Sequence, residues 1–179
     1  PWVVITCEAT QLEREWRELV RMVGQCQAIG ETGLDFFRDS QRLTYDRQVD
    51  FFHRHVKLAI DNDKPLILHV VRGHGEVLNI LRASNGARGI VHGFRSSEQI
   101  AAQHFDLGFK LSFPATSLLR NIKLRDVFCK FRAHALLETD APNSKGAIQE
   151  NPLICLVKDV TRLAEILDLS VGVIMGDCY

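Results

Sequence analysis

The sequence predicts a parallel α/β fold, and two observations support this. Short apolar runs alternate along the chain with amphipathic stretches of helical period. These runs are almost continuously apolar, as expected for parallel strands that are covered on both faces. Strand–helix alternation without an internal linker or repeat leaves two architectures open, a doubly wound sheet and a (β/α)8 barrel. We expect a single domain over residues 1–179, because this length suffices for one core.

Five apolar runs are the candidate strands. They are AIGE, PLILHVV, GIVHGF, FKLSF and ALLETD, at residues 28–31, 65–71, 89–94, 109–113 and 135–140. Each is bounded by turn-forming or helical sequence.

Helices are predicted in the intervals between the strands. Thr10 and Glu13 match a capping box, Ser40 is placed to cap the helix before the second strand, and Ser96 and Gln99 form another capping box. A late helix carries one apolar line, formed by Ile154, Val157, Thr161 and Ala164, and Ser170 begins a further helix.

Composition gives limited information about partners and compartment. Lysine plus arginine equals aspartate plus glutamate at 22 each, so the charge balance does not support a nucleic-acid partner, and it does not exclude one. The five cysteines form no CxxC pair, which is typical of reduced thiols in a cytoplasmic protein. The first residues do not resemble a signal peptide, and no apolar run approaches the ~18 residues that span a bilayer.

Four candidate strands end in a potential metal ligand: Glu31, His69, His92 or Asp140. Each alone has an ordinary explanation, such as a buried histidine or a carboxylate that caps a turn. Active sites of parallel α/β folds gather at the carboxyl ends of strands. Imidazole and carboxylate together suit divalent cations, so the joint pattern predicts a metal site.

The motifs GETGLDF, PLILHVVR, VHGF and LLETDAP, in this order, resemble those of the TatD-type deoxyribonucleases. The resemblance runs from Pro1 to about Leu169. It implies a (β/α)8 TIM-type barrel that hydrolyses DNA phosphodiester bonds with a metal-activated water, using divalent ions (Mg, Mn or Zn), two of them in a complete protein. It also implies that Glu31 bridges the metals, that His69 and His92 are ligands, and that Asp140 is a ligand which helps to activate the water.

Further residues near these motifs have supporting roles by the same resemblance. Arg72 and Arg95 are candidate phosphate-binding residues, because a guanidinium binds phosphate bidentately, although a solvated loop position is the alternative for each. Asp35 and Glu138 are expected to support the site by hydrogen bonding rather than to carry out chemistry.

One expected feature of the family is absent from this sequence, namely a His-x-His on the first strand. His53 and His55 have this spacing, but they lie in a helical stretch where they point apart, so we expect ordinary helix-surface residues. The chain therefore resembles an incomplete barrel, truncated at both ends, with about six of eight β/α units and without the first two strands. An exposed sheet edge of this kind favours self-association. Two alternatives stay open: an amidohydrolase-type enzyme for a non-nucleic-acid substrate, and an inactive truncated chain.

Overall fold

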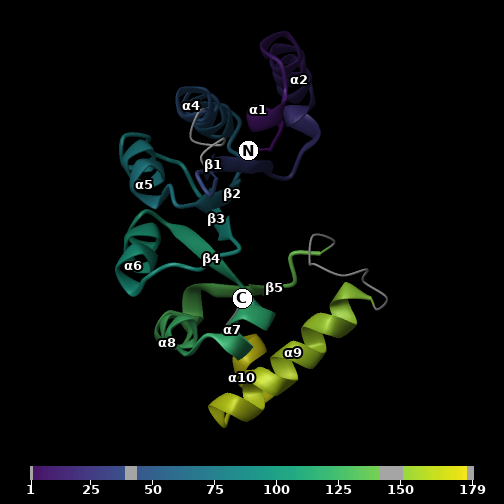
Figure 1. Cartoon of the computed structure of the whole chain (residues 1–179), viewed down its shortest axis with the longest axis vertical. Helices are drawn as coiled ribbons and strands as arrows, with labels where there is room; N and C mark the ends of the chain where they lie inside the picture. The colour runs from purple at the N-terminus through teal and green to yellow at the C-terminus, as the bar shows by residue number, and fades with distance from the viewer. Residues whose placement is uncertain (1, 39–43, 142–150, 177–179) are drawn as a thin grey trace. The chain divides into compact units, whose positions relative to one another are not determined.

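The computed structural model describes residues 2–38, 44–141 and 151–176. Five strands form one sheet in the order β1-β2-β3-β4-β5 (Figure 1). Their bounds are β1 Ile29–Asp35, β2 Leu66–Val71, β3 Gly89–His92, β4 Phe109–Pro114 and β5 Ala135–Glu138. The registered pairs β1–β2 and β4–β5 are parallel. The predicted α/β class and all five predicted strands are confirmed.

The chain divides into two compact units, which are described separately. The first comprises Pro1–Val91 and Asp106–Phe109, and the second comprises His92–Phe105 and Lys110–Tyr179. The single domain expected from the length remains a prediction.

The first unit contains helices around β1 and β2. They are α1 Trp2–Thr6, α2 Ala9–Met22, the short 3-10 helix η1 Val23–Gln25, α4 Tyr45–Asp61 and α5 His74–Arg82. The buried face of α4 includes Phe52 and Val56, each 1% exposed, and α4 contacts β1. The strands contribute Leu34, Leu66 and Leu68 to the same apolar interior.

An ion pair links α2 to α4. Both terminal nitrogens of Arg54 donate to the Glu13 carboxylate, at 2.6 and 3.0 Å. The guanidinium carbon also lies 4.4 Å from the Trp16 ring centre and 4.2 Å from that of Phe51. The Arg54 hydrogen bonds lower the pKa of Glu13 and raise that of Arg54. The planar guanidinium group of Arg54 binds the carboxylate through two nitrogens and also lies against both rings. Lysine has a single charged nitrogen, so it would not be a conservative replacement.

Strand β1 contains an extra residue relative to β2. Ile29 pairs with Leu66 and Thr32 with Leu68, so β1 advances three positions while β2 advances two. Further along, Gly33 lies opposite His69 with a φ of 129°, and a Cβ there would lie 2.2 Å from the His69 carbonyl oxygen. Glycine is therefore required at this position, where a Cβ would overlap the backbone of β2.

Two predicted helix starts are wrong, and a third lies outside the described residues. The first predicted helix corresponds to α2, which begins at Ala9 with Glu8 at its N-cap, so Thr10 lies inside the helix. The hydroxyl of Ser97, not Ser96, accepts from the backbone N–H of Ile100, at the start of α6 Glu98–Asp106. Neighbouring hydroxyl residues offer similar capping patterns, so sequence spacing alone does not fix the start. Ser40 is not among the described residues.

The second unit continues with helices that follow each strand. Besides α6, they are α7 Ala115–Arg120, α8 Ile122–Lys130, the 3-10 helix η2 Arg132–His134, α9 Pro152–Leu167 and α10 Val171–Gly176. Phe113 packs edge-on against both Phe94 and Phe128, at centroid distances of 5.4 and 5.5 Å. As predicted, the Ser170 hydroxyl caps α10 by accepting from the Val173 N–H at 3.1 Å.

The apolar line predicted for the late helix is mostly on its exposed side. Val157 is 63% exposed and Ile154 is 48% exposed, whereas Val160 and Leu163 are buried. The helix thus carries two apolar lines, and the line that includes Val160 and Leu163 is the buried one.

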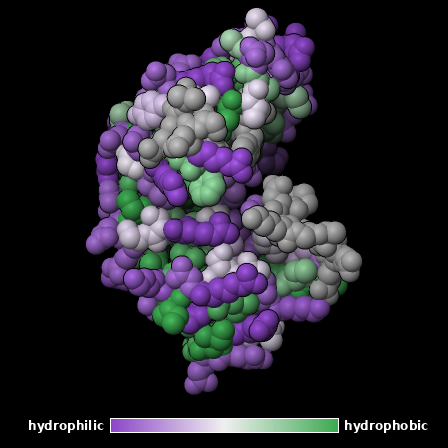
Figure 2. All heavy atoms as spheres, viewed as in Figure 1, coloured by the Kyte–Doolittle hydropathy of each residue, from purple (hydrophilic) through white to green (hydrophobic). Residues whose placement is uncertain are grey.

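Hydrophilic residues predominate on the face of the molecule shown in Figure 2, with separate hydrophobic patches between them. No helix in the described ranges combines the length and apolarity that a membrane span requires.

Candidate metal centre

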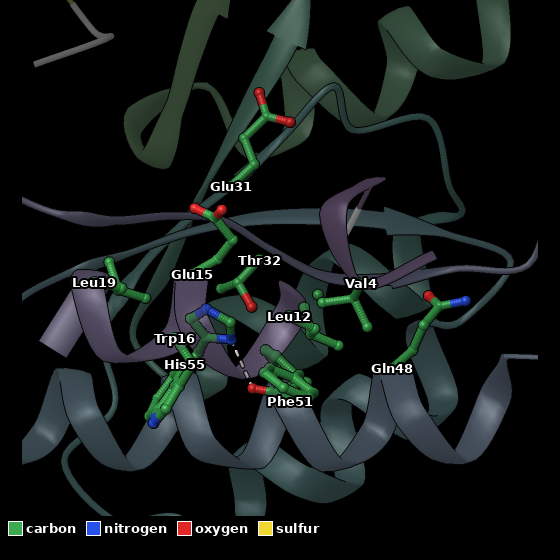
Figure 3. Close-up of a pocket in the computed structure, with 12 residues that line it drawn as sticks. Val4, Leu12, Glu15, Trp16, Leu19, Glu31, Thr32, Gln48, Phe51 and His55 are labelled. Carbon is green, nitrogen blue, oxygen red and sulfur yellow. Dashed lines mark hydrogen bonds between the residues drawn. The ribbon is translucent and has the colours of Figure 1, made fainter. Parts of the chain in front are cut away.

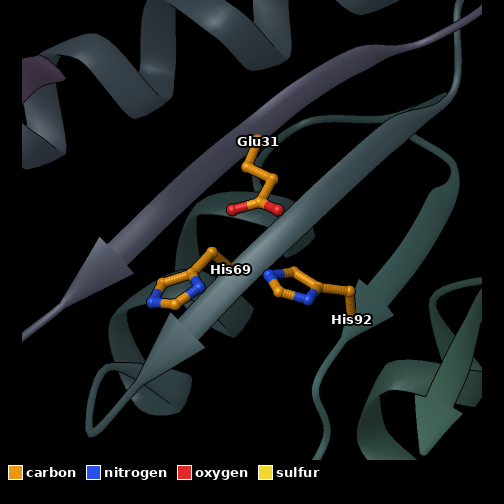
Figure 4. Close-up of side chains that lie close together, drawn as sticks. All are labelled: Glu31, His69 and His92. Atoms are coloured by element: carbon orange, nitrogen blue, oxygen red, sulfur yellow. The ribbon is translucent and has the colours of Figure 1, made fainter. Parts of the chain in front are cut away.

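Three of the predicted ligands come together. One ligand atom each from Glu31, His69 and His92 lies within 4.8 Å of the other two. Figure 4 shows the Glu31 carboxylate directed between the imidazoles, with one nitrogen of each ring turned inward and the other turned away. A carboxylate and two imidazoles at this spacing form a donor set that suits a divalent cation.

These ligands do not all end their strands, which corrects the sequence interpretation. Glu31 is the third residue of β1, which continues to Asp35, and His69 is the fourth residue of β2. Only His92 is the last residue of its strand, β3. Glu31 lies in the segment where the register of β1 shifts, and the residue is exposed.

Asp140 follows β5 by two residues and is half-buried. Its φ is 55°, the left-handed region that aspartate visits more readily than most residues. Its carboxylate is not part of the group formed by Glu31, His69 and His92 within the described chain. Its predicted roles as ligand and water-activating residue remain predictions.

Asp35 supports His69, as expected of it. Its Oδ2 lies 3.3 Å from Nε2 of His69, and its Oδ1 accepts from the Phe37 backbone N–H at 2.9 Å. The residue is only 3% exposed. One carboxylate thus orients an imidazole and stabilises the turn after β1.

Glu138 has the corresponding position beside His92. Its Oε1 accepts from the Gly93 backbone N–H at 2.7 Å and lies 3.8 Å from Nδ1 of His92. The latter distance is too long for a direct hydrogen bond but keeps negative charge near the ring. The side chains of His92 and Glu138 are 12% and 18% exposed, so this pair is partly buried.

Both candidate phosphate-binding arginines are exposed. Arg72 donates to the Phe37 carbonyl oxygen at 3.3 Å and lies over the Phe37 ring at 5.1 Å. Arg95 donates through Nε to the Ser117 hydroxyl at 3.0 Å. Their accessibility is compatible with phosphate contact, which stays a prediction.

The two helix histidines differ, so the expectation for them holds only in part. His53 is exposed, but His55 is half-buried and its ring meets Trp16 edge-on at 5.2 Å. Its Nδ1 lies 2.6 Å from the Phe51 carbonyl oxygen. Burial lowers the pKa of His55 to about 4. Helix α2 packs on α4 and covers the side that carries His55. The spacing of the two histidines in the sequence did not indicate this contact.

A cavity of about 480 Å³ in the first unit reaches Glu31, one of the three candidate ligands (Figure 3). Glu31 contributes to its lining, together with side chains from α1, α2, β1 and α4. Most of the wall is apolar or aromatic, and it includes Trp16, Phe51 and Leu12. The carboxylate of Glu31 therefore lies where an apolar cavity and two imidazoles meet.

Sequence reasoning missed Gln48, which contacts Asp35 from α4. Its Oε1 accepts from the Asp35 backbone N–H at 2.8 Å, and its Nε2 donates to the Asp35 carbonyl oxygen at 3.1 Å. Gln48 is 1% exposed. The available signal was its place four residues before Phe52, in the apolar line of α4, where an amide is unusual.

Comparison with known proteins identifies the family of this chain. The model of the family "TatD related DNase" matches residues 3–176. An uncharacterized metal-dependent hydrolase of Escherichia coli K12, YjjV, is 38% identical over 135 residues, which is 74% of this chain and 51% of that protein. The metal-dependent hydrolase TatD of Mycobacterium tuberculosis, also uncharacterized, is 31% identical over 163 residues, covering 84% of this chain and 61% of its own.

Solved structures show the same fold. The crystal structure of Escherichia coli YjjV, a TatD homologue, has a TM-score of 0.76 at 30% identity and covers 96% of this chain and 68% of that one. A TatD-family hydrolase from Entamoeba histolytica has a TM-score of 0.70 at 17% identity, over 94% of this chain and 65% of that one, and supports the fold alone. The chain spans about half the length of the first curated relatives that it matches. With a family match over nearly its whole length and the α/β fold of the TatD barrels, this chain belongs to the TatD-related DNase family.

Proposed function

We propose that this chain is the metal-binding part of a hydrolase that cleaves DNA phosphodiester bonds. The observation that carries the proposal is the group formed by Glu31, His69 and His92, whose ligand atoms lie within 4.8 Å of one another. Family membership supports hydrolysis, since the relatives are named metal-dependent hydrolases, and the family name supports DNA as the substrate.

The described residues would hold a divalent ion through one carboxylate and two imidazoles. Such an ion lowers the pKa of water and polarises a phosphoryl oxygen. Asp35 and Glu138 orient or electrostatically support the two rings through the contacts given above. Asp140 is proposed to take the proton of the attacking water, and Arg72 and Arg95 to hold phosphate oxygens as charged donors.

The decisive experiment compares two histidine variants of the full chain. His69→Asn removes a proposed ligand, whereas His53→Asn changes an exposed histidine of α4 and serves as the matched control. Cleavage of a labelled DNA oligonucleotide is measured with Mg²⁺, Mn²⁺ or Zn²⁺, and again with a chelator. We expect activity to fall by at least about 100-fold in His69→Asn and with chelator, and to be unchanged in His53→Asn.

Some outcomes would contradict the proposal. Absence of metal-dependent DNA cleavage by the unmodified chain would oppose nuclease activity, and an equal rate in Glu31→Gln would remove Glu31 from the mechanism. Metal-dependent hydrolysis of an ester or cyclic amide, without DNA cleavage, would favour the amidohydrolase-type alternative.

We also propose that two copies associate through the edge of β1 that faces away from β2. In the described sheet β1 is the first strand, and the Gln48 amide binds this edge at Asp35. The part of the edge before Asp35 is the proposed template for a second chain. Light scattering coupled to size exclusion should give twice the monomer mass, and a proline at an edge position of β1 should reduce it. A monomer at all concentrations would refute this association.

A cytoplasmic location is the third part of the proposal. Among the described residues Cys7, Cys26 and Cys129 are free thiols, which suits a reducing compartment. Detection of the protein in a secreted or periplasmic fraction would refute it.

A further inference from the structure

The geometry points to Gln48 as a positioning residue that, through Asp35, determines which nitrogen of His69 is available to a metal. This inference rests on the metal site of the proposed function. It concerns one hydrogen-bonded series within the first unit, from Gln48 of α4 to Asp35 of β1 and His69 of β2.

The first step is the attachment of Gln48 to the backbone of β1. Its side-chain amide accepts from the Asp35 N–H at 2.8 Å and donates to the Asp35 carbonyl at 3.1 Å. This two-point contact has the donor and acceptor pattern that a neighbouring strand would offer. These two partners fix the orientation of the amide, because the N–H only donates and the carbonyl only accepts. Nε2 also donates to the Thr44 hydroxyl at 3.0 Å. The backbone that carries the Asp35 carboxylate is therefore held from the helix.

The second step is the orientation of the Asp35 carboxylate. The Phe37 backbone N–H donates to Oδ1 at 2.9 Å, so Oδ2 is the oxygen that faces His69. With 1% and 3% exposure, Gln48 and Asp35 are almost removed from water, which would otherwise compete for these hydrogen bonds.

The third step concerns the imidazole. A carboxylate oxygen only accepts hydrogen bonds, so Nε2 of His69 is the donor and carries hydrogen. In the neutral ring Nδ1 then carries the lone pair, which is what metal coordination requires. Figure 4 shows one nitrogen of His69 turned toward Glu31 and His92 and the other turned away, as this assignment requires.

The test reads the His69 tautomer directly in the metal-free full chain. Nitrogen NMR of ¹⁵N-labelled imidazoles distinguishes hydrogen on Nε2 from hydrogen on Nδ1, and the His69 signals are assigned by their loss in His69→Asn. Zn²⁺ affinity is then measured by calorimetry on the same samples.

Asp35→Asn is the sharpest variant because it keeps the shape of the side chain. The Phe37 N–H still needs an acceptor, so the amide oxygen of the new side chain should take the place of Oδ1 and its NH₂ group should face His69. A donor at this place requires Nε2 to accept. We expect the hydrogen to move to Nδ1 and Zn²⁺ affinity to fall by about 10–100-fold.

Gln48→Met tests the helix contribution with a side chain of similar length. We expect a mixture of His69 tautomers and a fall in Zn²⁺ affinity of roughly 10-fold. Thr44→Val is the matched control, because it removes the Thr44 contact and leaves both contacts to Asp35 possible. Thermal unfolding of each variant shows whether it is folded, and Asp35→Asn decides the question if Gln48→Met is not.

Two results would overturn the inference: hydrogen on Nδ1 in the unmodified chain, or an unchanged tautomer in Asp35→Asn. If folded Gln48→Met keeps both the His69 tautomer and the Zn²⁺ affinity of the unmodified chain, Gln48 is not a positioning residue. Because the tautomer is read without metal, absence of metal binding or DNA cleavage would refute the proposed function and leave this measurement decisive.

Discussion

Asp35 and Glu138 each face one imidazole of the candidate metal centre, but they are held differently. Asp35 is 3% exposed, and both of its oxygens have named partners, Phe37 and His69. Glu138 is half-buried and approaches Nδ1 of His92 only to 3.8 Å, while it binds the backbone of the adjacent Gly93. The first carboxylate orients its ring directly, and the second holds the backbone that carries its ring. We conclude that substituting Asp35 should disturb the orientation of His69 more than substituting Glu138 disturbs that of His92.

The largest expected difference concerns the two glycines near these pairs. A Cβ on Gly33 would lie 2.2 Å from the His69 carbonyl oxygen, whereas on Gly93 the nearest atom, Oε1 of Glu138, would be at 3.7 Å. Gly33→Ala should lower the free energy of unfolding by about 3 kcal/mol or more, because backbone must move. Gly93→Ala, with a φ of 61°, should cost about 1–2 kcal/mol. Urea unfolding of both variants measures this, and equal losses would contradict the close approach at Gly33.

The second prediction concerns the free energy of unfolding, which should decrease as the pH is lowered. Burial lowers the pKa of His55 and of His74 to about 4, from 6.5, and both residues lie in the first unit. Between these values the unfolded chain binds protons that the folded chain does not, so stability falls as pH decreases from about 6.5 to about 4, by up to about 3 kcal/mol per histidine.

His55→Phe should flatten this dependence by removing one of the two groups while keeping a ring against Trp16. His53→Gln, at an exposed position, should leave the slope unchanged. The free energy of unfolding is measured from pH 4 to pH 7.5, and a slope that His55→Phe leaves intact would show that His55 is not protected from protonation.

The third prediction compares the two carboxylates by metal affinity. Asp35→Asn replaces an acceptor by a donor at 3.3 Å from His69 and should weaken Zn²⁺ binding by about 10–100-fold. Glu138→Gln retains an oxygen for the Gly93 N–H, so its effect should stay below roughly 10-fold. Calorimetry at one pH provides both values, and a larger effect at Glu138 would reverse the comparison drawn above.

The smallest effect is expected at Thr44. Thr44→Val removes the hydroxyl that accepts from Gln48 at 3.0 Å and should cost about 0.5–1.5 kcal/mol of stability. Zn²⁺ affinity should change by less than about 2-fold, because the Gln48–Asp35 contacts remain. Thermal unfolding and calorimetry test the two parts, and a large affinity loss would extend the positioning series to Thr44.

Much of the fold was predictable because buried parallel strands leave a strong apolar pattern. All five strands lie where the runs placed them, and Glu31, His69 and His92 were predicted and come together. The buried side of α9 was not predictable, since Val157 and Val160 belong to two apolar lines of one helix and only tertiary packing selects between them.

Gln48 illustrates what local sequence does not contain. Its partner is the backbone of Asp35, 13 residues earlier, and backbone groups leave no trace in side-chain patterns. Its presence in an apolar line indicated a buried polar contact, but not with which atom. The residues that gather at the site were therefore easier to predict than the hydrogen bonds that orient them.

The extra residue in β1 between Ile29 and Thr32 has a consequence for sequence change in this family. Side chains of a strand alternate between its faces, so losing one residue at this point would shift Ile29, and the chain before it, by one position relative to β2 while the pairs from Thr32 to Asp35 keep their register. A deletion of one codon here would leave composition and apolar pattern almost unchanged while disturbing the segment that carries Glu31. Alignments of related genes should therefore show length differences before or after this segment, but not within it.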